Sequence, residues 1–328
     1  MKVFDDMIRS IERLGDETIS DNTLHIAYGV DKKYVFPMGL SMTSVLKHNP
    51  HAVFHLFVDE VSLEDRQRII ATMEKYHSQC HIYYLNTEAL ASLPTTKVWS
   101  VAMYFRIVAA AYLSSRIDKV LYLDADTFCR ADISGVYFED INEYYTAAVE
   151  NRFPTAEMYD RARKKLDLGS CKYFNSGVMI INLKKWGGQH LSEKAIHLLM
   201  TNPEKWKDWP DQDVLNYICK GHVKWLPCWY NFFRAHDEEV QRVAEKGKII
   251  HFIGPKPWLQ WYLTETVPAM DKEYNQSHDE SAWSDVPYWE PKTVVEYRLM
   301  SKRCLWDKRF INMLHWQIRY LLRKFNLR

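Results

Sequence analysis

The sequence lacks several features that would each indicate a class of protein. Its 328 residues carry 43 Lys and Arg against 42 Asp and Glu, so there is no overall basic surplus of the kind that indicates a nucleic-acid partner. The six cysteines form no C-x-x-C pair and no zinc-binding spacing. No internal repeat or low-complexity tract is present. We therefore expect neither a nucleic-acid-binding protein nor a zinc protein nor a repeat protein.

Signals for crossing a membrane are also missing. No run of about 18 apolar residues occurs, which argues against a spanning helix. The first residues include Asp5, Asp6 and Glu12 and no apolar core of a signal peptide. These absences predict a cytoplasmic protein, or one held at a membrane surface.

The sequence does contain an abrupt end to an apolar strand. Residues 120–123 are apolar, and Asp124 and Asp126 follow directly in L-Y-L-D-A-D. Buried carboxylates without partners cost several kcal/mol each, so stability alone does not explain them. Mg²⁺ or Mn²⁺ would accept these oxygens and leave positions for substrate phosphates. A turn with Asp caps is the simpler alternative.

Alternating strand and helix patterns surround this motif. They predict an α/β fold with a doubly wound, mostly parallel sheet. Residues 1–22 are polar and predict a leader helix or loose arm, and the aromatic-rich stretch 258–289 predicts irregular structure. The expected strands are 24–28, 53–58, 81–85, 120–123, 145–149, 178–182 and 248–252.

The C-terminal residues 302–328 are strongly basic. They hold eight Lys and Arg and one acid, a charge of +7 that leaves −6 on the rest of the chain. Apolar residues recur every three or four positions, which predicts an amphipathic helix for an anionic membrane surface. A helix packed on the main domain is the alternative. The apolar face comprises Phe310, Leu314, Ile318, Leu321 and Phe325.

Polar residues at the ends of other predicted strands could contact a ligand. In A-Y-G-V-D-K-K-Y, Gly29 allows close approach, Asp31 can bond a ribose or base, and Tyr34 can stack on a ring. In Y-F-N-S-G, Asn175 and Ser176 suit sugar hydroxyls. Both segments could equally be ordinary turns.

Further polar residues occur in helices and near the last strand. Arg106, in an apolar helix, is either a surface side chain or a buried clamp for an anionic or hydroxylated substrate. At the start of another helix, capping explains one of the acids but not three polar side chains in sequence, Asp211, Gln212 and Asp213. His251 with two carboxylates favours Mn²⁺ over Mg²⁺, and Lys256 suits a phosphate.

Six ordered motifs together resemble the family 8 retaining glycosyltransferases, over roughly residues 22–262. Within that family the chain is most similar to the bacterial lipopolysaccharide core α-glycosyltransferases that use UDP-glucose or UDP-galactose. The basic tail resembles the C-terminal extension of that subgroup. The motifs are A-Y-G-V-D-x-x-Y, W-S-x-A-M-Y-F-R, L-Y-L-D-A-D, Y-F-N-S-G, P-D-Q-D-V-L-N and H-F-x-G-P-K-P-W.

The resemblance implies a Rossmann-like GT-A domain over 23–262, an N-terminal arm over 1–22 and a C-terminal extension over 263–328. It implies transfer of glucose or galactose from a UDP-sugar to a hexose of the lipopolysaccharide outer core. The extension would hold the enzyme peripherally on the cytoplasmic face of the inner membrane, through 302–328.

The resemblance also implies roles for individual residues. Mn²⁺, or Mg²⁺, would be held by Asp124, Asp126 and His251. The uridine would contact Gly29, Asp31 and Tyr34, and the phosphates Gly254 and Lys256. The donor sugar would be surrounded by Arg106, Glu150, Asn175, Ser176, Asp211 and Gln212. Glu150 stands where many members have Asp, and Lys33 where many have Asn.

Several alternatives remain open at this stage. Apolar-D-A-D-T also fits a haloacid-dehalogenase-type phosphatase, and the tail fits a non-catalytic membrane-surface adaptor. For sugar transfer with retention, Gln212 is a poor nucleophile, which favours front-face attack over a double displacement. The sequence does not distinguish glucose from galactose, nor identify the linkage or the oligomeric state.

Overall fold

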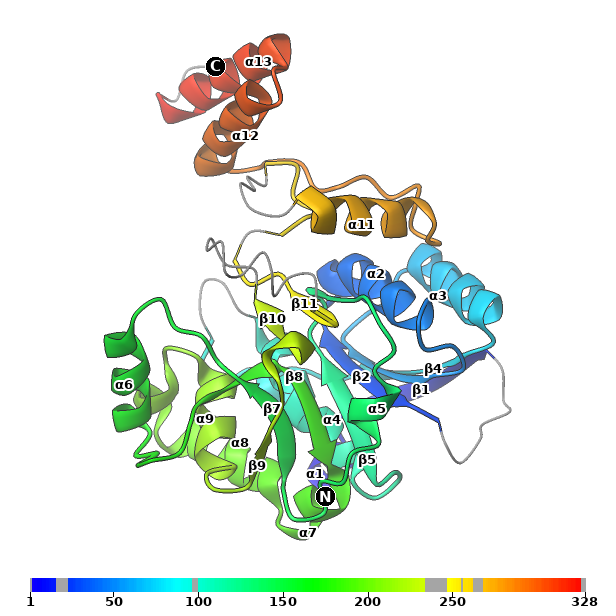
Figure 1. The fold of residues 1–328 in the computed structure, drawn as a ribbon, viewed down its shortest axis with the longest axis vertical. Helices are drawn as coiled ribbons and strands as arrows, with labels where there is room; N and C mark the ends of the chain where they lie inside the picture. Colours follow the sequence, from blue (N-terminus) through cyan, green and yellow to red (C-terminus); the bar gives the residue numbers. More distant parts are fainter. Residues whose placement is uncertain are drawn as a thin grey trace. The chain divides into compact units, whose positions relative to one another are not determined.

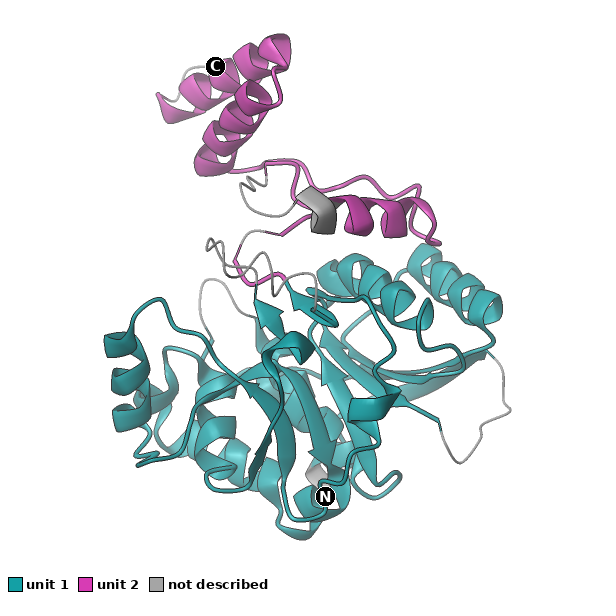
Figure 2. Cartoon of the chain, in the orientation of Figure 1, with its two compact units in different colours: residues 1–233, 246–251 teal, residues 234–245, 252–328 magenta. Residues whose placement is uncertain are grey.

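The computed structural model describes residues 2–15, 23–95, 100–233, 247–254, 256–261 and 268–325. By contacts the chain divides into two compact units (Figure 2). They comprise Met1–Phe233 with Lys246–His251, and Arg234–Glu245 with Phe252–Arg328.

The first unit is built on a sheet whose eight described strands run in the order β1-β4-β3-β2-β5-β8-β7-β9 (Figure 1). Four of the seven neighbouring pairs are parallel, which confirms the predicted α/β sheet. The bounds are β1 Ile8–Gly15, β2 His25–Val30, β3 Val53–Val58, β4 Gln79–Leu85, β5 Lys119–Leu123, β7 Thr146–Glu150, β8 Phe174–Asn182 and β9 Val223–Trp225.

Helices connect and cover these strands. α2 and α3 lie side by side (Figure 1), and α4 packs on β2 and β3. The bounds are α1 Lys2–Asp5, α2 Val35–Leu46, α3 Leu63–Tyr76, α4 Phe105–Leu113, α5 Ser134–Tyr137, α6 Ala156–Lys165, α7 Leu183–Gly188, α8 Leu191–Thr201 and α9 Pro210–Ile218.

The order of the strands determines where a ligand can bind. The chain moves outward from β2 to β3 and β4, and then returns past β2 to β5. In open α/β sheets, ligands bind beyond the carboxyl ends of the strands where the order reverses. Here that point lies between β2 and β5, which end just before Asp31 and Asp124.

The N-terminal residues differ from the prediction. Residues 1–22 were expected to form a leader helix or a loose arm, but Ile8–Gly15 forms β1 and pairs antiparallel with β4. Leu14 is the one residue of this strand that is buried. Because an edge strand pairs its backbone on one side and can expose most side chains, its sequence carries little apolar alternation. Residues 16–22 lie outside the described residues.

A small second sheet follows the D-A-D motif. Its strands are β6 (Thr127–Cys129), β11 (Ile249–His251) and β10 (Phe232–Phe233), and β6 pairs antiparallel with β11. Residues that are more than 100 positions apart in the sequence therefore become neighbours at the end of β5.

The described part of the second unit contains three helices joined by irregular segments. Its helices are α11 (Pro268–Asp279), α12 (Val294–Trp306) and α13 (Phe310–Lys324). The aromatic-rich stretch expected to be irregular thus contains α11, and it buries Trp258 and Trp283. α12 and α13 form a hairpin with its own small core. Among the described residues, no helix combines the length and apolar character that crossing a bilayer requires.

Candidate active site

Three potential metal ligands meet beyond the end of β5. Asp124 and Asp126 follow the strand directly, and the pairing of β6 with β11 places His251 opposite Thr127. One ligand atom from each of Asp124, Asp126 and His251 lies within 4.8 Å of the other two. The structure therefore brings together the three residues for which the sequence predicted a metal site.

The donor atoms of these side chains fit a divalent cation. His251 Nε2 lies 3.1 Å from Asp126 Oδ1 and 3.9 Å from Asp124 Oδ2. A Cβ on Gly177 would lie 2.6 Å from Asp124 Oδ2 and closer still to His251. Only glycine leaves both ligands where they are, and one imidazole with two carboxylates suits Mn²⁺.

Arg106 is a buried clamp and not a surface side chain. Its guanidinium lies 2.7 Å from Asp124 Oδ1 and 3.2 Å from Asp211 Oδ2. It also donates to the carbonyl and hydroxyl oxygens of Ser176, at 2.7 Å each. The same group stacks on the ring of Tyr122, 4.7 Å from its centroid. The guanidinium of Arg106 therefore holds the carboxylates of Asp124 and Asp211 in place.

The cluster gathers three carboxylates in a small, largely buried space. Asp124 and Asp211 both pair with the Arg106 guanidinium, and Asp126 lies beside His251. Burial raises the pKa of Asp124, Arg106 opposes this effect, and Asp126 adds to it. A divalent cation bound between Asp124 and Asp126 would favour the ionised form of both carboxylates.

Gln212 and its neighbours form the adjacent wall. Gln212 Oε1 accepts hydrogen bonds from the Ser176 backbone N–H at 3.0 Å and from Asn175 Nδ2 at 3.1 Å. The hydroxyl of Ser176 lies 3.4 Å from Asp211 Oδ2. The four polar residues predicted from Y-F-N-S-G and P-D-Q-D thus lie together. Arg106 connects them to the metal cluster, because it contacts Ser176, Asp211 and Asp124.

The β2 end of the site is built around Asp31. Its carboxylate accepts hydrogen bonds from the Tyr34 backbone N–H at 3.3 Å and from Ser100 Oγ at 2.9 Å. Burial, with the charges of Asp126 and Asp31, raises the pKa of Tyr34 to about 12. A Cβ on Gly29 would lie 2.7 Å from Phe105 Cβ, so close packing of α4 accounts for this glycine without a ligand.

The three other predicted contact residues have partners of their own or belong to the second unit. Glu150 accepts a hydrogen bond from Tyr159 and pairs with Lys172 at 2.9 Å. Gly254 and Lys256 belong to the second unit, where Gly254 has φ +85° and Lys256 Nζ donates to the Phe252 carbonyl at 2.6 Å.

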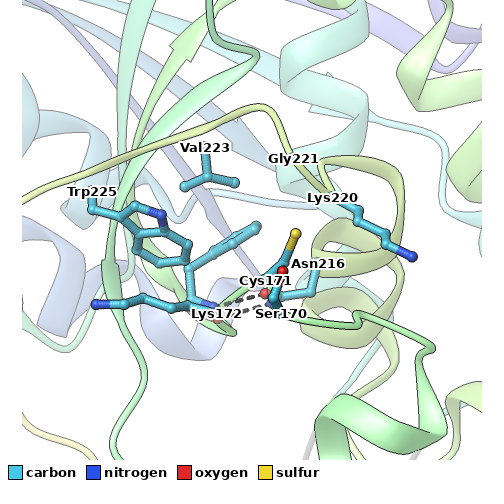
Figure 3. Close-up of a pocket in the computed structure, with 9 residues that line it drawn as sticks. Ser170, Cys171, Lys172, Asn216, Lys220, Gly221, Val223 and Trp225 are labelled. Atoms are coloured by element: carbon cyan, nitrogen blue, oxygen red, sulfur yellow. Dashed lines mark hydrogen bonds between the residues drawn. The ribbon is translucent and has the colours of Figure 1, made fainter.

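A separate cavity of about 250 Å³ opens near β9 (Figure 3). Trp225 and Val223 line it together with Lys172 and Lys220. Lys172 is already paired with Glu150, and Lys220 donates to the Asp167 carbonyl at 2.5 Å. The cavity contains none of the metal-cluster residues, so we place the chemistry at the end of β5.

Sequence reasoning did not single out several residues of the site. Asn231 is buried and bonds His251 Nδ1 at 2.9 Å, and Tyr173 bonds both Gln212 and Asp213. A buried Asn or Tyr carries no recognisable spacing. Gly177 did carry a signal, because glycine inside an apolar strand indicates a close approach.

Two family models match the chain. The model for glycosyl transferase family 8 matches residues 25–262, and the model for its C-terminal region matches residues 269–324. The first alone spans more than half of the chain.

Curated relatives match over nearly the whole length. The lipopolysaccharide 1,2-glucosyltransferase of Escherichia coli K12 is 34% identical over 318 residues, covering 92% of this chain and 91% of that protein. The lipopolysaccharide 1,3-galactosyltransferase of Salmonella typhimurium is 33% identical over 314 residues, with the same two coverages.

Solved structures share the fold. The galactosyltransferase LgtC, in complex with donor and acceptor sugar analogs, superposes with a TM-score of 0.66 at 23% identity, covering 79% of this chain and 96% of that one. The bifunctional glycosyltransferase WbbM gives 0.64 at 17% identity, covering 83% of this chain and 52% of that one. The similarity supports the predicted GT-A fold.

Proposed function

This chain belongs to the family 8 glycosyltransferases, and from that premise we propose that it transfers glucose or galactose from a UDP-sugar to a hexose of the lipopolysaccharide core, with retention. Relatives named as lipopolysaccharide glucosyl- and galactosyltransferases support both the donor and the acceptor. The match to a glycosyltransferase model argues against the phosphatase and adaptor alternatives.

The observation that carries the proposal is the cluster of Asp124, Asp126 and His251 beside Gln212. Mn²⁺ bound there would act as a Lewis acid toward the charge that develops on the departing UDP. Arg106 holds Asp124 at 2.7 Å, so one oxygen of this carboxylate is engaged and the other faces His251. The protein thus orients its ligands before any substrate arrives.

The hydrogen bonds of Gln212 argue against its acting as a nucleophile. Its carbonyl oxygen already accepts from two donors, and Asp211, the adjacent carboxylate, is paired with Arg106. We therefore favour front-face attack, in which the acceptor hydroxyl gives its proton to the departing phosphate oxygen. The Gln212 carbonyl dipole would then stabilise positive charge at the anomeric carbon.

The second unit supports a place at the membrane surface. α13 contains Arg319, Arg323 and Lys324 and no acidic residue. Several of its apolar side chains are exposed, including Phe310, Ile311, Leu314, Ile318 and Leu321, as is Phe325 directly after the helix. We propose that this face binds the anionic lipid of the cytoplasmic leaflet, where the lipid-linked acceptor would also be found.

Calorimetry with UDP tests the proposal directly. We expect UDP to bind in the presence of Mn²⁺ and to bind much more weakly after chelation of the metal. The purified enzyme should then transfer from UDP-glucose or UDP-galactose to truncated lipopolysaccharide, with an α linkage in the product. Hydrolysis of p-nitrophenyl phosphate without UDP binding would contradict the proposal.

A further inference from the structure

A continuous line of hydrogen bonds runs from the metal cluster through the first unit to a buried carboxylate. It begins at His251 Nδ1 and passes through Asn231, Asn175, Gln212 and Tyr173 to Asp213. The five distances, in this order, are 2.9, 2.9, 3.1, 3.1 and 2.7 Å.

Two backbone N–H groups fix the direction of this line. A backbone N–H can only donate, so Asn175 Oδ1 accepts from Gly177 N–H at 3.0 Å. In the same way, Gln212 Oε1 accepts from Ser176 N–H at 3.0 Å. The amide groups of Asn175 and Gln212 therefore have one possible orientation each.

The remaining orientations follow from these two. Asn231 must donate its Nδ2–H to Asn175 Oδ1, which leaves Asn231 Oδ1 as the acceptor for His251. His251 therefore carries a proton on Nδ1, and its Nε2 lies 3.1 Å from Asp126 Oδ1, on the side where a metal would bind.

At the other end, Gln212 Nε2 donates a hydrogen bond to the Tyr173 oxygen, and the Tyr173 hydroxyl donates one to Asp213 Oδ1. Lys165 Nζ lies 3.0 Å from the second oxygen of Asp213. Every donor in the line thus points away from the metal ligand and toward Asp213.

We propose that Asn231, Tyr173 and Asp213 are positioning residues that act through this line of hydrogen bonds. Asn231 sets the tautomer of His251 that a metal requires, and Tyr173 with Asp213 holds the amide nitrogen of Gln212. Aligned hydrogen bonds polarise one another, so the chain strengthens each of its members. The partner of a metal-bound histidine commonly sets its tautomer and tunes affinity for the metal.

The burial of the residues in this line of hydrogen bonds supports a role in positioning the site. Asn231, Tyr173 and Asp213 are each at most 1% exposed. Burying an amide, a phenol and a carboxylate costs free energy unless all are satisfied, and apolar residues would fill the same space at less cost.

The inference rests on the proposed use of a divalent cation, and its first test needs no substitution. Nitrogen-15 NMR of the metal-free protein, with His251 assigned by loss of its signal in His251→Gln, reports the tautomer. We expect a proton on Nδ1, the nitrogen that faces Asn231. A proton on Nε2 alone would overturn the proposed line of hydrogen bonds.

The second test measures Mn²⁺ affinity in the presence of UDP. Asn231→Leu should weaken Mn²⁺ binding by about 10–100-fold, the usual effect of removing such a partner. Asn182→Leu is the matched control: Asn182 is buried at the other end of β8, opposite Lys119. It should lose stability without a change in Mn²⁺ affinity. Unchanged affinity in a folded Asn231→Leu variant would overturn the proposal.

The third test concerns the far end of the chain. Tyr173→Phe should lower kcat with little change in the KM for the donor, and its effect should be less than additive with Asn231→Leu. Tyr137→Phe, which removes a buried hydroxyl that bonds the Lys119 carbonyl, controls for the loss of one hydrogen bond. If the effects of Tyr173→Phe and Asn231→Leu on kcat are strictly additive, the two residues do not act through one line of hydrogen bonds and the proposal is overturned. Failure of the wild-type protein to bind Mn²⁺ would instead contradict the proposed function.

Discussion

At the scale of single residues, Gly177 shows how tightly the metal cluster is built. Its hydrogen atom occupies the place where a methyl group would meet both His251 and Asp124. Gly177→Ala should therefore displace a ligand and weaken Mn²⁺ binding by about tenfold or more. It should also cost about 1–3 kcal/mol of unfolding free energy, as overpacking usually does.

Calorimetry with Mn²⁺ and UDP measures the first effect, and chemical denaturation the second. Gly135→Ala in α5 is the control, because a methyl group there meets no atom within 4 Å. It should leave Mn²⁺ affinity unchanged and stabilise slightly. Equal Mn²⁺ affinity in the two variants would show that the cluster is looser than its distances indicate.

A second prediction at the residue scale concerns the side-chain amide of Gln212. Gln212→Ala should lower kcat by about 10²–10³-fold, because its carbonyl dipole is proposed to act mainly in the transition state. The dissociation constant of UDP should change little. Steady-state kinetics with a UDP-sugar, compared with UDP calorimetry, separates the two. A rise in KM at constant kcat would assign Gln212 to ground-state binding.

At the scale of elements, three histidines join strands β2, β3 and β4. His25 Nδ1 lies 3.0 Å from His55 Nε2, and His55 Nδ1 lies 3.0 Å from the Tyr83 hydroxyl, which His81 also bonds. Burial lowers the pKa of all three histidines, that of His81 to about 4. For His55, the charges of the other two histidines add to the effect, and for His81 the nearby Arg13 does so.

The sign of the resulting pH dependence follows from these shifts. Below about pH 6.5 the unfolded chain binds protons that the folded protein does not, so the free energy of unfolding falls as the pH drops from 6.5 toward 4. Each buried neutral histidine contributes about 1.4 kcal/mol per pH unit at most. His55→Phe should make this fall shallower between pH 7 and 5, as measured by urea denaturation. The exposed His197→Gln in α8 should not, and equal slopes in both variants would contradict the prediction.

The elements that the sequence predicted well are those buried on both faces. β3 and β8 are wholly buried, and their apolar runs predicted β3 in full and the second half of β8, residues 178–182. The first half of β8 includes the polar Asn175 and Ser176, so its sequence did not indicate a strand. β1 was missed because its pairing with β4 is a tertiary contact and its side chains are mostly polar. The ligand residues were readable because carboxylates at the end of a strand are unusual, whereas Asn231 reaches the site only through the β10–β11 pairing.

At the scale of the whole molecule, the C-terminal hairpin is a module with its own interior. Met300, Cys304 and Trp316 form its core, and Thr293 opens α12 with a capping box completed by Glu296. The predicted tail, 302–328, begins inside α12, so its boundary divides the hairpin. Residues 326–328 lie outside the described part of the chain. A clean truncation therefore removes residues 293–328.

This truncation tests the membrane proposal. The shortened protein should no longer sediment with anionic liposomes, yet should still hydrolyse UDP-sugar slowly, because the metal cluster belongs entirely to the first unit. Wild-type binding should weaken with added salt, because about 1 kcal/mol per basic residue at the surface is electrostatic.

Substitutions on the exposed face of α13 test its binding to lipid without disturbing the folded core of the hairpin. Phe310, Leu314 and Ile318 are each more than half exposed, so replacing all three with Gln leaves the hairpin core intact. Losing this apolar area should release the protein from liposomes even though every basic residue remains, because charge alone holds a protein weakly. Leu63→Gln, at a position 77% exposed on α3, is the control and should bind as the wild type does. If the triple variant still sediments with the liposomes, binding to the membrane belongs to another surface.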